Sequence, residues 1–132
     1  MKKVLTPGLA IERLKANDPT LTTVDLSNNA VLQMKGKELF PQLGEALANN
    51  TVCQELILVG CMVNDFACEQ LGEALKKNST LVVLNLENNN VGNDGAIAIA
   101  RSLAVNRGLL LLNLLNQKGA RYGAPPAGLS TL

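Results

Sequence analysis

The sequence predicts an α/β solenoid, a right-handed coil with short parallel strands on its concave face and helices on its convex face. Three observations lead to this fold class. A ladder of apolar residues recurs at a nearly constant spacing, helical segments keep the same spacing, and leucine occupies 25 of the 132 positions. Because aromatic residues make up only 2% of the chain, aliphatic side chains in a repeated arrangement must form the core.

The ladder places apolar residues at offsets 0, 3 and 5 of each copy, and an amide or cysteine at offset 8. Copies begin at residues 21, 53, 81 and 109, so the last three are 28 residues apart and the first gap is 32. This is the leucine-rich repeat pattern L-x-x-L-x-L-x-x-N/C. In each short strand, offsets 3 and 5 point into the core and offsets 2, 4 and 6 face outward. The residue at offset 8, such as Asn89, should hydrogen-bond backbone groups at the turn.

Three helical segments share the 28-residue period. They are LGEAL at 43–47, LGEAL at 71–75 and IARSL at 99–103, and an asparagine follows each one, at positions 50, 78 and 106. Small residues in matching columns, such as Gly44 and Gly72, should let neighbouring helices approach closely. Since the helices keep the period throughout, the extra residues of the first gap lie between Asn29 and Leu43. This predicts an enlarged loop at about residues 30–40.

Residues 1–117 are predicted to form one leucine-rich repeat domain, with an N-terminal capping helix over 6–16 and coils that start near 21, 53, 81 and 109. Thr6 has the side chain of a helix N-cap, and Pro7 suits the first helical position. The Gly-, Pro- and Ala-rich tail at 118–132 cannot continue a helix. Three alternatives follow for this end. The tail could fold back as a loose cover, the open strand edge could pair with another chain to give a homodimer, or the chain could be a fragment of a longer array.

Composition narrows the function class. The net charge is +1 without a run of like charge, so we expect neither a nucleic-acid nor a membrane partner. No span approaches the roughly 18 apolar residues of a membrane helix. The chain has no histidine, which removes histidine-dependent catalysis, and Cys53, Cys61 and Cys68 are expected in the core. These features predict a cytoplasmic protein that is not an enzyme and needs no cofactor or metal.

The outward-facing columns contain the candidate site. The first coil is polar there, whereas later coils place apolar residues where solvent-facing strands usually carry polar ones. A contiguous apolar patch marks a binding surface, although β-branched residues also stabilise strands. We therefore expect a protein partner on the concave sheet face, at Thr23, Asp25, Glu55, Ile57, Val59, Val83, Asn85, Glu87, Leu111, Asn113 and Leu115.

Several stretches carry a family resemblance: LKANDPTLTTVDLSNN at 14–29, NTVC at 50–53 and LLNQ at 114–117. The 28-residue coils resemble the ribonuclease-inhibitor-like subclass of leucine-rich repeats. More narrowly, residues 9 to about 117 resemble the leucine-rich domain of tropomodulins and leiomodins. This resemblance implies actin as a partner, at the filament pointed end. The sequence shows neither the long N-terminal region nor the basic C-terminal helix of that family, so we expect the scaffold part alone.

Overall fold

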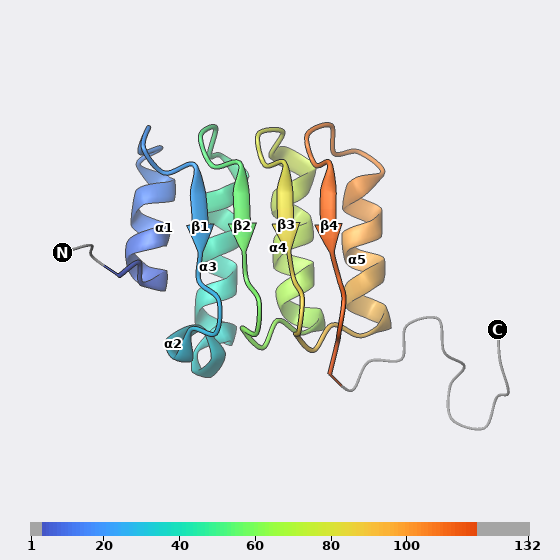
Figure 1. The fold of residues 1–132 in the computed structure, drawn as a ribbon. Helices are drawn as coiled ribbons and strands as arrows, with labels where there is room; N and C mark the ends of the chain where they lie inside the picture. Colours follow the sequence, from blue (N-terminus) through green and yellow to red (C-terminus); the bar gives the residue numbers. More distant parts are fainter. Residues whose placement is uncertain (1–3, 119–132) are drawn as a thin grey trace, which may run out of the picture.

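A computed structural model describes residues 4–118 and shows two layers, a parallel sheet and the helices that cover one of its faces (Figure 1). The sheet order is β1-β2-β3-β4, with every neighbouring pair parallel. This arrangement confirms the predicted fold class. The elements, in chain order, are α1 (Pro7–Lys15), β1 (Thr23–Asp25), α2 (Ala30–Met34), α3 (Gly36–Ala48), β2 (Glu55–Ile57), α4 (Asp65–Lys77), β3 (Val83–Asn85), α5 (Asn93–Leu103) and β4 (Leu111–Asn113).

Helix α1 covers the first coil, as predicted. It begins after Thr6, whose hydroxyl oxygen accepts a hydrogen bond from the Leu9 amide at 3.1 Å, and Pro7 occupies the first turn. The helix buries Ile11 and Leu14 against the solenoid. Helix α1 thus shields the core of the first coil from solvent, which is the role of a capping element in a solenoid.

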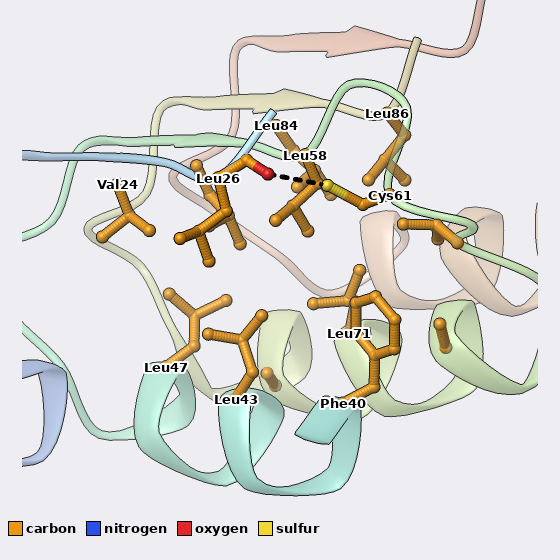
Figure 2. Packing of buried hydrophobic residues seen from close by; sticks show 14 of the residues in the cluster. Val24, Leu26, Phe40, Leu43, Leu47, Leu58, Cys61, Leu71, Leu84 and Leu86 are labelled. Carbon is orange, nitrogen blue, oxygen red and sulfur yellow. Dashed lines mark hydrogen bonds between the residues drawn. The ribbon is translucent and has the colours of Figure 1, made fainter. Parts of the chain in front are cut away.

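Aliphatic side chains from both layers meet in a continuous core (Figure 2). Leu58 and Leu84 from the strand side are fully buried, and Leu43 and Leu47 of α3 pack toward them. The helices lie very close together at Gly44, because a Cβ atom there would be 2.8 Å from the backbone oxygen of Gln70. The expected close approach of the helices is therefore confirmed.

The prediction of an enlarged loop at residues 30–40 is wrong. Helix α2 occupies residues 30–34, and α3 begins only two residues later. Asn29 caps α2, since its side-chain oxygen accepts a hydrogen bond from the Leu32 amide at 2.9 Å. Leu32 is buried, and this contact gives the short helix the apolar anchor that it needs to form.

A row of asparagines ties the coils together where the helices end. The side-chain nitrogen of Asn78 donates to the backbone oxygens of Leu47 and Asn50 in the preceding coil, at 2.7 and 3.0 Å. Asn106 donates in the same way to Leu75 and Asn78, at 2.8 Å each. Besides its place at the end of a helix, each of these asparagines thus satisfies backbone carbonyls of the preceding coil.

A second row of hydrogen bonds ties the coils together after the strands. The Asn89 side-chain nitrogen donates to Leu58 O at 2.8 Å, and that of Gln117 donates to Leu86 O at 2.8 Å. In the first gap between coils, the Cys61 thiol takes this role and donates to Leu26 O at 3.0 Å (Figure 2). The predicted structural role of the offset-8 residues is confirmed at these three positions.

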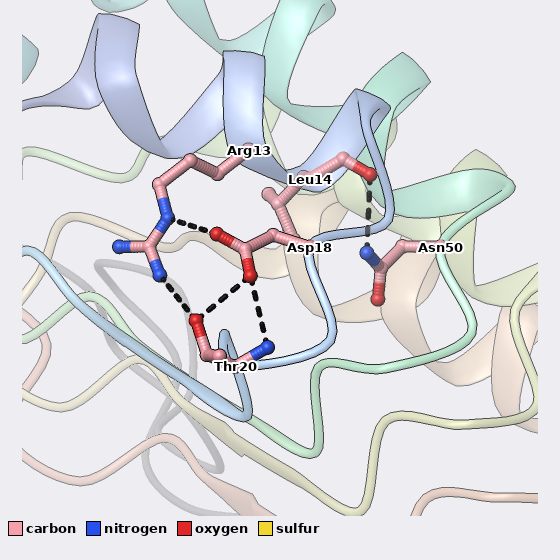
Figure 3. Close-up of polar contacts among 5 residues, drawn as sticks. All are labelled: Arg13, Leu14, Asp18, Thr20 and Asn50. Atoms are coloured by element: carbon pink, nitrogen blue, oxygen red, sulfur yellow. Dashed lines mark hydrogen bonds and ion pairs between the residues drawn. The ribbon is translucent and has the colours of Figure 1, made fainter.

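Polar contacts fix the connection between α1 and β1 (Figure 3). The Asp18 carboxylate accepts hydrogen bonds from the Thr20 amide at 2.9 Å and the Thr20 hydroxyl at 2.7 Å, and Arg13 Nε donates to it at 2.7 Å. The Thr20 amide contributes most, and together with the Thr20 hydroxyl and Arg13 it lowers the Asp18 pKa to about 2. Nearby, the Asn50 side chain donates to Leu14 O at 3.1 Å and attaches α1 to the second coil.

The last coil is less covered than the others. Leu112 and Leu114 are only half-buried, whereas the equivalent Leu84 and Leu86 are fully buried.

The tail prediction for 118–132 falls, apart from residue 118, outside the described residues, and the domain bounds stay predictions. Within residues 4–118, no helix has the length and hydrophobicity needed to cross a membrane.

Candidate functional site

The strand register brings the predicted site residues together on one face of the sheet. Thr23, Glu55, Val83 and Leu111 are direct neighbours across the four strands. A second row consists of Asp25, Ile57, Asn85 and Asn113. The remaining three, Val59, Glu87 and Leu115, follow the carboxyl ends of β2, β3 and β4. We call these eleven residues the strand face.

Apolar exposure on the strand face increases toward the last strand. Ile57, Val59 and Val83 are half-buried, because neighbouring strands cover their sides. Leu111 and Leu115 expose 52% and 65% of their surface. Strand propensity does not explain these two residues, since leucine is not β-branched. They form the most accessible apolar part of the strand face.

Part of the polar row also has a structural role. The Asp25 carboxylate accepts hydrogen bonds from the amide and hydroxyl of Ser27, at 3.0 and 2.7 Å. The side-chain oxygens of Asn85 and Asn113 accept from the amides two residues further on, at 3.0 and 2.9 Å. These Asx-type contacts hold the chain as it leaves each strand. A substitution at Asp25 would therefore change both the turn and the surface.

The strand face carries negative charge only. Asp25, Glu55 and Glu87 are its three charged residues, and no lysine or arginine belongs to it. The Glu87 carboxylate accepts a hydrogen bond from the Asn113 side chain at 3.0 Å, which orients both groups. A partner with basic groups around an apolar surface would complement this distribution.

The described residues hold no cluster of side chains suited to metal binding. Across positions 4–118, no three histidine, cysteine, aspartate or glutamate side chains gather closely enough to hold a metal ion. The three cysteines are buried as free thiols. Burial raises the pKa of each thiol, that of Cys68 to about 12, so none has the thiolate character of a nucleophile.

The sequence analysis missed a pocket of about 390 Å³ beside α2. Its walls include Met34, Phe40, Met62 and Phe66, together with Lys37 and Asn90. We call it the methionine pocket. The composition of the chain could have indicated the pocket. The chain has two phenylalanines and two methionines besides Met1, and all four line this one pocket. These residues are not on the strand face.

Comparison with protein families gives one match that spans most of the chain. The model described as "TMOD/LMOD Leucine-rich domain" matches residues 8–123. The comparison with curated protein sequences yielded no match.

Two solved structures have the same fold. "Leiomodin-1 Actin-Binding Site 2 (ABS2)" superposes with a TM-score of 0.80 at 30% sequence identity, and the match covers 89% of this chain and 66% of that chain. The tropomodulin C-terminal domain of Caenorhabditis elegans superposes with a TM-score of 0.76 at 24% identity, over 87% of this chain and 67% of that one. The chain thus spans 66 to 67% of the length of these structures.

Proposed function

The chain belongs to the family of tropomodulin and leiomodin leucine-rich domains, and from this premise we propose that it is a non-enzymatic, actin-binding domain. The observation that carries the proposal is its likeness to actin-binding site 2 of leiomodin-1, with a TM-score of 0.80 over 89% of this chain. The proposal includes a role in the cytoskeleton and a location in the cytoplasm.

We place the actin contact on the strand face. Two sheet-spanning rows of side chains are held in register there, so little conformational entropy is lost when a partner docks. Leu111 and Leu115 supply accessible apolar surface, which is the usual source of affinity at the centre of an interface. Glu87 on the neighbouring coil and Glu55 two strands away add negative charge to the same face, which favours a partner with basic groups.

Binding to actin monomers and filaments, measured by analytical ultracentrifugation and co-sedimentation, tests the partner. If neither form binds, actin is the wrong partner. An effect on pointed-end elongation of filaments would place the contact at that end.

Substitution of Leu111 by Asp tests the strand face. Burial of a leucine contributes roughly 1.5–3 kcal/mol, so we expect the Kd to rise about tenfold or more. Val105→Asp is the matched control, because Val105 is 54% exposed but follows α5, away from the sheet. Equal effects of the two substitutions would exclude the strand face as the actin contact.

Glu55→Lys tests the charge of the strand face better than a substitution at Asp25. The described residues show no side-chain hydrogen bond at Glu55, whereas Asp25 holds a turn. We expect Glu55→Lys to weaken binding and to reduce its salt dependence, because Asp25 and Glu87 keep the strand face negative. Unchanged affinity with unchanged salt dependence would show that the acidic groups do not contact actin.

A second candidate, self-association through β4, has one specific observation in its favour. Leu110, Leu111 and Leu115 are exposed at this last strand, and an open strand edge is a template for pairing. Sedimentation velocity over a hundredfold concentration range would reveal a homodimer, and Leu110→Glu should abolish it. A constant monomer mass would eliminate this candidate.

A further inference from the structure

We propose that the methionine pocket is a second docking site, which takes an apolar side chain from an acidic peptide segment of a protein partner. The pocket is formed by α2, the first turns of α3, the segment that joins β2 to α4, the first turn of α4 and Asn90 in the segment after β3. It shares no residue with the strand face, so this inference is independent of the actin contact.

The apolar walls of the pocket are unusually accessible. Met34 exposes 83% of its surface, Met62 48% and Phe66 37%, while Phe40 is buried at the base. Exposed methionines are flexible and polarisable, and surfaces built from them adapt to apolar side chains of different shapes. The volume of about 390 Å³ gives room for one or two such side chains.

Met62 adopts a conformation that its residue type disfavours. Its φ angle is 59°, in the left-handed region, which costs a non-glycine residue about 1 kcal/mol or more. The repeat itself does not require this, because its left-handed turn residue in this coil is Gly60, and Asn90, 28 residues after Met62, has no positive φ. The strain is local to the pocket and turns an apolar side chain toward solvent.

An unsatisfied amide lies next to Met62. The side-chain oxygen of Asn90 is buried and has no hydrogen-bond partner among the described residues. Its nitrogen meets only the Met62 sulfur, at 4.0 Å. Native structures leave few such groups unpaired, and Asn90 belongs to the lining of the pocket, so a peptide N–H group that entered the pocket would supply the missing donor.

The lining of the pocket carries one positive charge, that of Lys37. Lys35 and Glu38 are exposed on either side of it and offset each other. Within residues 4–118, the ion pairs join Arg13 to Asp18 and Lys76 to Glu73, so Lys37 is available to a ligand. A carboxylate beside the docked apolar side chain would complement it. One lysine is fewer than the basic cluster that anionic membranes select, which favours a peptide.

The methyl groups of the two methionines report occupancy directly. We would label methionine methyl groups with ¹³C, assign the signals with Met34→Leu and Met62→Leu, and titrate three blocked tetrapeptides, ELLE, KLLK and ESSE. The expected result is a saturable shift of both signals with ELLE, a clearly weaker shift with KLLK and no saturable shift with ESSE. ESSE keeps the charge of ELLE but lacks its leucines, so it tests the need for apolar side chains. KLLK keeps the leucines but carries the opposite charge, so it tests the need for carboxylates.

Variants then test each feature of the pocket. Lys37→Glu should raise the Kd for ELLE up to about fivefold, as expected for one exposed ion pair of at most about 1 kcal/mol. Lys15→Glu on α1 makes the same charge change elsewhere and should leave the Kd unchanged. Phe66→Ala should weaken binding further. Met34→Ala provides a second apolar variant, because a residue so exposed can be shortened without unfolding the chain.

Four outcomes would overturn the proposal. They are the absence of a saturable shift at millimolar ELLE, equal shifts with KLLK, equal loss of affinity in Lys37→Glu and Lys15→Glu, and methyl signals that move with protein concentration alone, which would identify a second copy as the occupant. Phosphatidylserine vesicles that shift both signals while ELLE does not would replace the peptide by a membrane surface. Loss of actin binding would leave this test unaffected, so the two proposals fail separately.

Discussion

Asn89 makes the most demanding set of side-chain hydrogen bonds in the described structure, and its replacement by alanine should be strongly destabilising. Its buried side chain accepts from the amides of Cys61 and Val63 at 2.8 and 3.0 Å, and it donates to Leu58 O and Leu86 O at 2.8 and 2.9 Å. Alanine would leave two buried N–H groups without an acceptor, at roughly 1–3 kcal/mol each. We therefore expect a loss of about 2–6 kcal/mol in the free energy of unfolding.

The adjacent asparagine provides the control for this experiment. Asn90 has the same side chain, but its amide oxygen has no partner, so Asn90→Ala should change the free energy of unfolding by less than about 0.5 kcal/mol. Urea unfolding followed by far-ultraviolet circular dichroism measures both variants. Similar losses in the two variants, or a loss below 1 kcal/mol in Asn89→Ala, would refute the inference that the offset-8 amide holds the coils together.

Three further predictions concern packing, pH and thiol reactivity. Gly44→Ala should lower the free energy of unfolding by about 1–3 kcal/mol, because the new Cβ would be 2.8 Å from a backbone oxygen of α4. Gly8→Ala, with open space around the new Cβ, should be neutral or stabilising, and thermal unfolding compares the two variants. The pKa of Asp18 is about 2 in the folded protein and 3.8 ordinarily, so its contribution to stability is present above pH 4 and lost as the pH falls toward 2. Asp18→Asn should remove that part of the acid sensitivity, and a parallel decline in both proteins would contradict it. The thiols should resist Ellman's reagent at pH 8 until the protein unfolds, because burial raises the pKa of Cys53, Cys61 and Cys68.

Periodicity made most of the fold predictable. The leucine ladder identified the core-facing positions, and the structure buries Leu84 and Leu86 as the offsets require. The same offsets placed the outward columns, which the register brings side by side, for example Asp25 beside Ile57. Repeated neighbours impose the same geometry on each coil, so one copy of the pattern predicts the others.

Features that occur once in the chain were not predictable in this way. Helix α2 fills the only irregular gap between coils, so no second copy of it exists from which to recognise a period. The left-handed conformation of Met62 also has no signal in a residue type that favours other regions. The methionine pocket depends on both features and on Phe66 from α4, and such a combination of long-range contacts is visible only in three dimensions.

The asparagine row has a direction. Asn50, Asn78 and Asn106 each donate to carbonyls of the segment that precedes them in the chain. During synthesis from the N-terminus, each coil can therefore complete its side-chain hydrogen bonds only after the asparagine of the following coil has been made. The last coil of a partly synthesised chain lacks these bonds.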